Sequence, residues 1–210
     1  MDQYKEYGYT TLTPNYAHQY LVPVLLKLLD PDKNRCILDV GCGNGSLGAV
    51  LHQQGYNVYG IDASSQGIAL ANQVLPGRFF VQNISSGMLP EELQQKDFDT
   101  IISTEVIEHL YDPRAFIEFC KSVLSKSRGS KQLILSTPYH GYWKNLALAI
   151  TGALDAHFTV LWDGGHIKFW SRKTLGALLQ EKEFKVTAFR GAGRLPYLWK
   201  SMVIRGELSV

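Results

Sequence analysis

The chain has 210 residues, of which 45% are hydrophobic and 19% charged, a composition typical of one globular domain with a sizeable core. A formal net charge of +2 and scattered lysines and arginines argue against a nucleic-acid-binding protein. Cys36, Cys42 and Cys120 are odd in number and lack metal-ligand spacing, so we expect reduced thiols and a cytoplasmic protein.

Residues 1–34 predict a helical segment ahead of the main sheet. The opening stretch MDQYKEYGYTTLTPNY lacks the apolar core of a signal peptide, and the chain has no run of ~18 apolar residues. Neither export nor a membrane-spanning helix is therefore expected. Residues 15–29 have helical apolar spacing interrupted by Pro23, and DPDKN then ends the helix.

Short apolar runs then alternate with helical segments. Strands are predicted for CILDV, NVYGI, RFFVQ, FDTIIS and KQLILST. Between them we expect helices over 46–54, 64–73 and 113–125, and a helical turn over 89–95. Strands separated by helices indicate βαβ units with right-handed crossovers, and hence an α/β fold with a doubly wound, mostly parallel sheet.

The turn after the first strand is rich in glycine. Ligands of doubly wound sheets bind beyond the carboxyl ends of the strands. Gly41, Gly43 and Gly45 allow a tight turn and a close backbone approach to a ligand, and the helix that begins near Ser46 directs its positive end at an anionic group. Asp62 ends the second strand, where its carboxylate can accept hydrogen bonds from both hydroxyls of a ribose. NAD and S-adenosylmethionine (SAM) fit this pattern equally well.

Asp39 distinguishes between these two nucleotides. It stands just before the glycine turn, where a carboxylate would repel the pyrophosphate of NAD. The same carboxylate suits the ammonium and sulfonium groups of SAM. The turn therefore favours a methyl donor.

The stretches ILDVGCGNG, VYGID, FDTIISTEVIEHLYDP and LILSTP resemble, in order and spacing, the motifs of class I SAM-dependent methyltransferases. Within that superfamily the chain is most similar to the O-methyltransferases of ubiquinone biosynthesis, on the Glu-x-x-Glu-His of Glu105–His109, on STPYHGYWKNLALAITG and on GGHIKFWSRKTL. The resemblance implies one Rossmann-like domain over 1–210 with a seven-stranded sheet. FKVTAFRG and LWKSMVIRGEL, after a helix over 171–183, are then the antiparallel C-terminal hairpin that closes the sheet.

The resemblance also implies which residues bind SAM. They lie at the carboxyl ends of the first four strands: Asp39, Gly41, Cys42, Gly43, Asp62, Ala63, Asn83, Ile84 and Thr104. Asp62 would hold the ribose, Ala63 would pack on the adenine, and Asn83 would accept from the adenine amino group. Relatives have an N-terminal arginine for the SAM carboxylate, whereas the first arginine here is Arg35. Lys5, Tyr16 or backbone amides are the candidates to replace it.

Methyl transfer depends mainly on aligning the acceptor with the S–CH₃ bond, but a hydroxyl acceptor must also lose its proton to a base or near a metal. Glu105, Glu108 and His109 have i, i+3, i+4 spacing, so a helical turn would bring them to one face, where they could hold a divalent cation such as Mg²⁺. His109 could instead be the base or a structural histidine. His166, in WDGGHIKFW, is a second candidate base or a residue that orders its loop.

Residues 139–168 are expected to be an inserted lid that covers the acceptor. Their aromatic side chains suit a flat or greasy acceptor: Tyr139, Tyr142, Trp143, Phe158 and Trp162. Three roles stay open for this segment, namely a lid helix packed on the sheet, a dimer contact, and a surface that dips into a membrane to reach a lipidic substrate. The protein would be a monomer or a homodimer.

The leading interpretation is a SAM-dependent O-methyltransferase that acts on a small-molecule acceptor, an aromatic or quinone-like hydroxyl compound. A protein that binds SAM without catalysis, as a sensor or assembly partner, is the alternative from another class. A sugar, carboxylate or nitrogen acceptor is the alternative within the enzyme class. The Glu105, Glu108 and His109 group and the aromatic segment favour the enzyme.

Overall fold

The computed structural model describes residues 8–158, 161–162 and 164–208. Lys5 and three residues of the predicted lid therefore lie outside the described residues. The strands are β1 (Cys36–Val40), β2 (Asn57–Asp62), β3 (Phe79–Val81), β4 (Thr100–Thr104), β5 (Gln132–Pro138), β6 (Phe184–Ala192) and β7 (Ser201–Leu208). The α-helices are α1 (His18–Leu28), α2 (Ser46–Gln53), α3 (Ser65–Val74), α4 (Pro113–Leu124), α5 (Tyr142–Ile150), α6 (Leu154–Phe158) and α7 (Arg172–Glu181). Three 3-10 turns complete the set: η1 (Ile84–Ser86), η2 (Glu91–Leu93) and η3 (Ile107–His109).

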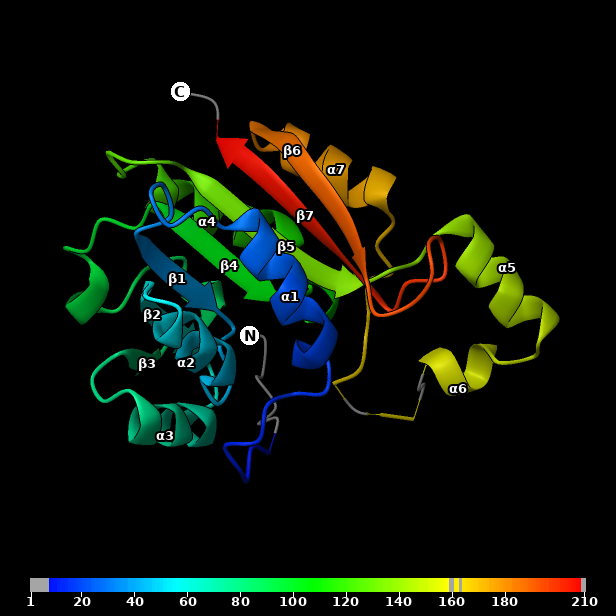
Figure 1. Ribbon diagram of the computed structural model, residues 1–210, viewed down its shortest axis with the longest axis horizontal. Helices are drawn as coiled ribbons and strands as arrows, with labels where there is room; N and C mark the ends of the chain where they lie inside the picture. Colours follow the sequence, from blue (N-terminus) through cyan, green and yellow to red (C-terminus); the bar gives the residue numbers. More distant parts are fainter. Residues whose placement is uncertain (1–7, 159–160, 163, 209–210) are drawn as a thin grey trace.

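The seven strands form one sheet in the order β3-β2-β1-β4-β5-β7-β6 (Figure 1). The first five are parallel, whereas β7 pairs antiparallel with both β5 and β6. The predicted doubly wound sheet and its antiparallel C-terminal hairpin are confirmed. Because β1 has β2 on one side and β4 on the other, the strand order reverses at β1, and the carboxyl ends of these strands mark the site where such sheets bind ligands.

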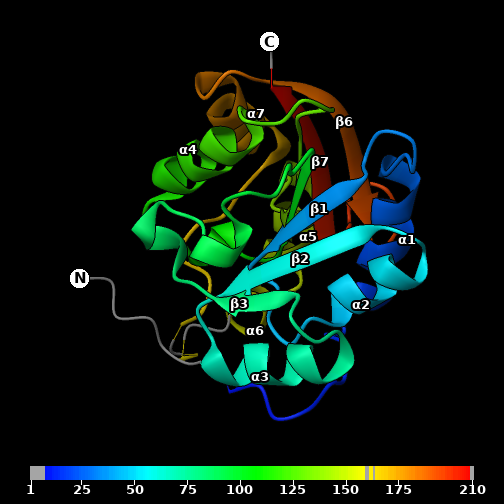
Figure 2. The same cartoon turned by 90° about the vertical axis from the view of Figure 1, so that its left-hand side faces the viewer.

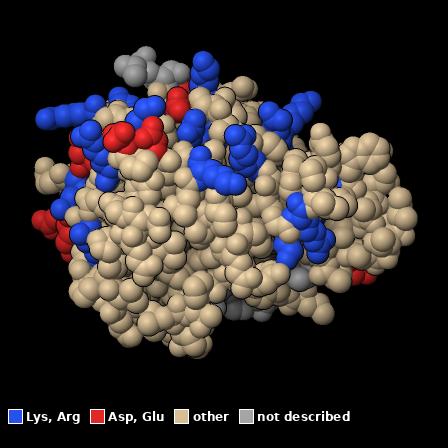
Figure 3. Space-filling model, in the orientation of Figure 1, with Lys and Arg blue, Asp and Glu red and all other residues tan. Residues whose placement is uncertain are grey.

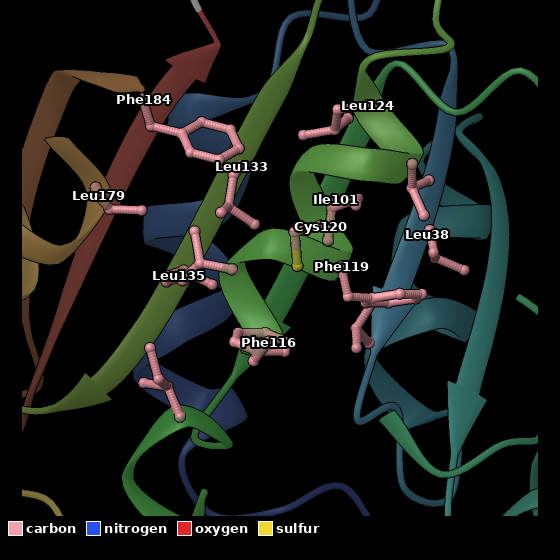
Figure 4. Packing of buried hydrophobic residues seen from close by; sticks show 14 of the residues in the cluster. Leu38, Ile101, Phe116, Phe119, Cys120, Leu124, Leu133, Leu135, Leu179 and Phe184 are labelled. Carbon is pink, nitrogen blue, oxygen red and sulfur yellow. The ribbon is translucent and has the colours of Figure 1, made fainter. Parts of the chain in front are cut away.

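Two helical layers cover the sheet, with α1 and α2 on one face and α4 and α7 on the other (Figure 2). Neighbouring strand residues alternate between these layers, as a period of two requires. Leu38 and Ile101 face α4, and Figure 4 shows Ile101 beside Cys120 and Leu38 beside Phe119 of that helix. Their chain neighbours Ile37 and Ile102 belong instead to the cluster that contains α1 and α2. Both faces of the central strands are buried, so apolar residues such as Ile37 and Leu38 follow one another directly along the chain.

Local signals set most helix boundaries. Asp112 caps α4 by accepting from Ala115 N at 2.9 Å, and Ser64 caps α3 by accepting from Gly67 N at 2.9 Å. The first helix differs from the expectation, because α1 begins only at His18 and continues through Pro23 without a break. Its apolar stripe is fully covered by the sheet, and this burial outweighs the backbone hydrogen bond that proline removes.

Two smaller expectations were wrong in extent. The third strand is shorter than RFFVQ and comprises only Phe79–Val81, and the turn predicted over 89–95 is the single 3-10 turn Glu91–Leu93. Both lie towards the edge of the sheet, where fewer tertiary contacts extend regular structure.

The segment after β5 forms α5 and α6, which project from one end of the molecule (Figure 1). Its base is fastened to the domain by backbone bonds, from His140 N to Trp170 O at 3.1 Å and from Ile167 N to Glu108 O at 2.9 Å. Among the described helices, none is long and apolar enough to cross a bilayer.

Candidate functional site

A cavity of about 1080 Å³ lies beyond the carboxyl ends of the central strands. All nine residues that the sequence assigned to nucleotide binding line it: Asp39, Gly41, Cys42, Gly43, Asp62, Ala63, Asn83, Ile84 and Thr104. Glu105, His109 and His166 line the same cavity, whereas Glu108 lies behind its wall. Parallel strands bring their ends to one edge of a sheet, so residues far apart in the sequence meet here.

The glycine turn leaves the cavity floor as bare backbone. Gly41 and Gly43 have φ values of 79° and 54°, in the left-handed region that favours glycine. A Cβ on Gly43 would collide with the ring and hydroxyl of Tyr9, which belongs to the N-terminal segment. The turn is pinned to β2 by Gly41 N and Cys42 N, which donate to Ile61 O at 2.8 and 3.1 Å. Glycine at position 43 therefore lets the Tyr9 side chain pack directly against this turn at the edge of the cavity.

Two carboxylates face the cavity beside this turn. Asp62 accepts hydrogen bonds from Gly43 N and Ser64 N, each at 2.8 Å. Asp39 is 1% exposed, and neither of its oxygens has a hydrogen-bond partner among the described residues. Burial, together with the charge of Asp62, raises the pKa of Asp39 to about 7. A buried carboxylate without a partner calls for a cationic group in the ligand.

Glu105 does not belong to a helical turn, contrary to expectation. Its φ of 54° turns the chain out of β4, and the 3-10 turn begins only at Ile107. Its carboxylate accepts from Ser136 Oγ at 2.7 Å and from Ser201 Oγ at 3.0 Å, so it is tied to β5 and β7. Burial raises the pKa of Glu105 to about 6 despite these hydrogen bonds.

The structure brings together a different set of potential metal ligands from the predicted set of Glu105, Glu108 and His109. Glu108, His109 and His166 each offer one ligand atom, and these three atoms lie within 4.8 Å of one another. Glu108 is fully buried, and neither of its carboxylate oxygens has a hydrogen-bond partner among the described residues. Burial and the nearby Glu105 raise the pKa of Glu108 above its usual range. Glu105 lies outside this group because its side chain is held by the two serines.

The orientation of His109 is fixed by its loop partner. Its Nδ1 lies 2.9 Å from Gly164 O, and a carbonyl can only accept, so Nδ1 carries the hydrogen and Nε2 keeps its lone pair. The His166 ring lies 4.9 Å from the His109 ring. Burial lowers the pKa of both imidazoles, to about 4 for His166. Two neutral imidazoles therefore meet at one wall of the cavity.

The predicted aromatic cover is largely absent from the cavity. Of its five members only Trp162 lines it. Tyr139 is buried against Trp199, and Tyr142 and Trp143 point outwards with exposed fractions of 73% and 60%. The outward residues lie on α5, which buries only Lys144. Composition alone had no information on which side of this helix faces the site.

The N-terminal segment is the part of the site that sequence reasoning missed most clearly. Residues 8–17, blue in Figure 1, cross the cavity, and Asn44 Nδ2 ties them down by donating to Thr11 O and Thr13 O at 2.9 and 3.0 Å. His18 at the start of α1 also lines the cavity, and its Nδ1 lies 3.1 Å from Ser46 Oγ. The one sequence signal for this contact was Asn44 inside the glycine turn, because an asparagine amide can hydrogen-bond to the backbone of another segment.

Comparisons with known proteins agree with this geometry. A family model described as a methyltransferase domain matches residues 15–188. The ubiquinone biosynthesis O-methyltransferase of Bradyrhizobium diazoefficiens is 32% identical over 117 residues, which are 56% of this chain and 45% of that protein. The protein of the same description from Dinoroseobacter shibae is 31% identical over 131 residues, covering 61% of this chain and 50% of that protein. The chain thus spans about half the length of these relatives.

Solved structures share the fold. The magnesium protoporphyrin IX methyltransferase of Synechocystis, solved with S-adenosylhomocysteine bound, has a TM-score of 0.66 at 22% identity and covers 97% of this chain and 91% of its own. A SAM-dependent methyltransferase from Methanosarcina mazei has a TM-score of 0.63 at 22% identity and covers 90% of this chain and 98% of its own. At these identities the likeness concerns the architecture of the sheet and its helices.

Proposed function

The chain belongs to the methyltransferase domain family, and from this premise we propose that it transfers a methyl group from SAM to a hydroxyl of a small aromatic or quinone-like acceptor. The observation that carries the proposal is Asp39, a fully buried carboxylate at the cavity floor with no partner among the described residues. The ammonium and sulfonium of SAM supply the missing positive charge, whereas the pyrophosphate of NAD would be repelled. The proposed catalytic unit is the single domain 1–210.

The remaining contacts of the cofactor follow from the strand ends. Asp62 already accepts two backbone hydrogen bonds, and each carboxylate oxygen can accept another from a ribose hydroxyl. Ala63 and Ile84 are small or apolar walls of the cavity, suited to the faces of an adenine. Asn83, which follows β3, would meet the adenine amino group. Thr104, which ends β4, would meet the methionine half of SAM.

The chemistry needs alignment and a proton acceptor. A lone pair of the acceptor oxygen forms the bond to the methyl carbon while the S–CH₃ bond breaks. The electron pair of the broken bond goes to sulfur, which becomes the uncharged thioether of S-adenosylhomocysteine. The hydroxyl proton goes to His109 Nε2, whose lone pair is available because Nδ1 donates to Gly164 O. His166 lies beside His109 and is the second candidate base.

Glu108, His109 and His166 also fit a divalent cation, since the buried Glu108 oxygens have no described partner. Such an ion would lower the pKa of a bound acceptor hydroxyl. Two imidazole nitrogens and one carboxylate suit Zn²⁺, Mn²⁺ or Fe²⁺ better than Mg²⁺, which prefers oxygen ligands. A cation-binding His109 cannot also be the free base, so the two mechanisms are alternatives that chelation distinguishes.

An apolar surface next to the site favours a lipidic acceptor drawn from a membrane. Tyr142, Trp143 and Ile150 on α5 are exposed, as are Leu195 and Tyr197 of the β6–β7 connection, and Lys144 of α5 joins the two segments by donating to Lys200 O at 3.3 Å. The end of the molecule that carries α5 has few acidic side chains and a cluster of basic ones beside it (Figure 3). Aromatic and aliphatic side chains flanked by positive charge suit an anionic bilayer surface.

Binding and turnover test the function in two steps. Calorimetry should give SAM and S-adenosylhomocysteine affinities in the micromolar range or tighter and no heat with NAD. Transfer of label from methyl-tritiated SAM to catechol and polyprenyl-phenol acceptors should follow. SAM binding without transfer to any hydroxyl, carboxylate, sugar or amine acceptor would favour a sensor or assembly protein instead.

Vesicle binding tests the apolar surface separately. The protein should sediment with phosphatidylglycerol vesicles, and Trp143→Ser with Ile150→Ser should lose this property while SAM affinity stays unchanged. Val74→Ser is a matched control, because Val74 is an exposed apolar residue on α3. Equal sedimentation of all variants would refute the membrane role.

A further inference from the structure

The cavity has a charge pattern that is incomplete for SAM. Its lining contains Asp39, Asp62, Glu105 and Asp112, but within residues 8–158, 161–162 and 164–208 it contains no lysine or arginine. SAM carries a carboxylate on its methionine half as well as its two cations. The acidic floor attracts the cations and repels this carboxylate. The carboxylate therefore needs hydrogen-bond donors that offset this negative charge.

Tyr16 offers such a donor. Tyr16 lines the cavity two residues before α1 and is 62% exposed, and its hydroxyl oxygen accepts a hydrogen bond from Lys200 Nζ at 2.8 Å. The same ammonium lies 4.3 Å from the centre of the Tyr16 ring. Because the oxygen of Tyr16 already accepts from a cation, its own O–H remains to donate to a ligand. Lys200 also lowers the pKa of Tyr16, which makes this O–H a stronger donor.

The neighbouring tyrosine is engaged elsewhere. The Tyr20 hydroxyl lies 3.4 Å from Ser201 Oγ, and Ser201 in turn donates to Glu105 at 3.0 Å. Tyr16 and Tyr20 meet edge to face at 6.2 Å, so Tyr16 is held on the same side of the cavity as Glu105. The start of α1 is also there, and the positive end of its dipole favours an anion. These observations single out Tyr16 on the side where the methionine half would lie.

We propose that the Tyr16 hydroxyl, held and polarised by Lys200, binds the carboxylate of SAM. The proposal rests on the proposed function, and it deepens it by naming a ligand contact and its source of charge. Lys200 precedes β7, so the positive charge comes from the C-terminal hairpin rather than from the N-terminal segment. Tyr16 contacts the ligand, and Lys200 is a positioning residue that acts through it.

Two ligands that differ only in the carboxylate test the assignment. Calorimetry would compare S-adenosylhomocysteine with its decarboxylated analogue, 5′-deoxy-5′-(3-aminopropylthio)adenosine, which keeps the ammonium. Tyr16→Phe should weaken S-adenosylhomocysteine about 10- to 30-fold, because a charge-assisted hydrogen bond is lost. The affinity for the analogue should stay within about twofold of wild type. Lys200→Met should weaken the first ligand about 3- to 10-fold and leave the second unchanged.

The double variant and two controls complete the design. Tyr16→Phe with Lys200→Met should bind no more weakly than Tyr16→Phe alone, since both changes remove one hydrogen bond. Tyr142→Phe and Lys27→Met make the same chemical changes at exposed positions outside the cavity, and neither should alter either affinity. Thermal unfolding of each variant without ligand checks that the fold is kept.

The outcomes separate this assignment from the function. If wild type binds neither ligand, the proposed function fails and the assignment with it. If wild type binds both but Tyr16→Phe weakens them equally, or leaves S-adenosylhomocysteine within twofold, the function stands and the Tyr16 assignment is overturned. A carboxylate-specific loss in Lys5→Met and not in Tyr16→Phe would overturn it in favour of Lys5.

Discussion

Replacing Asp39 by Asn should stabilise the protein without ligand and weaken its binding of SAM. Asp39 is fully buried, and burial together with Asp62 raises its pKa to about 7. In the unfolded chain the pKa returns to about 3.9. Between these two values the folded state binds more protons than the unfolded state, so the contribution of Asp39 to stability falls as pH rises. Asn has a similar shape and does not titrate.

The magnitude follows from the pKa. From pH 5.5 to about pH 7 the folded carboxyl is protonated while the unfolded one is ionised, so the stability of the wild-type protein falls by about 1.36 kcal/mol per pH unit. Above pH 7 both carboxyls are ionised and this loss stops. About 1.5 pH units therefore give a loss of about 2 kcal/mol between pH 5.5 and pH 8.0. The stability advantage of Asp39→Asn over wild type should therefore be about 2 kcal/mol larger at pH 8.0 than at pH 5.5. Groups that titrate alike in both proteins cancel in this comparison.

Urea denaturation of both proteins at the two pH values measures the difference, with Asp32→Asn as a control that makes the same substitution at an exposed position. Calorimetry should show that the wild-type affinity for SAM falls as pH drops below 7, because a protonated Asp39 no longer attracts the cations. The affinity of Asp39→Asn should be lower than that of wild type at pH 8.0 and nearly independent of pH. A stability advantage equal at both pH values, or an unchanged SAM affinity, would refute the reasoning.

Four further outcomes are expected. Asp62→Ala should weaken SAM binding by ~2–3 kcal/mol through loss of charge-assisted bonds to the ribose, and an affinity within twofold of wild type would refute that contact. His109→Ala should lower kcat ~10²–10⁴-fold, and an unchanged kcat would exclude it as the base. EDTA should leave kcat unchanged if His109 works alone, whereas a loss reversed by Zn²⁺ or Mn²⁺ would assign a cation to Glu108, His109 and His166. Residues 139–168 should gain protection from hydrogen exchange when SAM and acceptor bind, and equal protection in both states would indicate fixed packing.

The nucleotide half of the site could be predicted from the sequence because it depends on local chain geometry. Alternating strands and helices imply a parallel sheet, and a parallel sheet brings the ends of its strands to one edge. Asp39, Gly43 and Asp62 could therefore be assigned to one site, although they belong to a strand, a turn and the next strand. The closing hairpin was expected from the resemblance to class I methyltransferases, and its two strands are consecutive in the sequence.

The acceptor half was decided by tertiary structure. A one-residue change of backbone region at Glu105, with φ at 54°, removes it from the turn that its spacing predicted. His166 reaches His109 only because the inserted segment returns across η3, where Glu108 O accepts from the backbone of Ile167 and Lys168. Periodicity carries no information on such a return path.

The lack of a local pattern also explains why the place of the N-terminal segment and the orientation of α5 were not predicted. Residues 8–17 have no regular pattern, so only the folded chain shows that Asn44 binds them across the glycine turn. The aromatic side chains of α5 were visible in the sequence, but their direction depends on which face of the helix the domain covers. The sequence by itself determined the parallel sheet through short-range periodicity. It determined the residues at the strand ends through the geometry of parallel strands together with the resemblance to class I methyltransferases. Which distant loops close over that edge was decided only by tertiary packing, since their positions depend on contacts that no local pattern encodes.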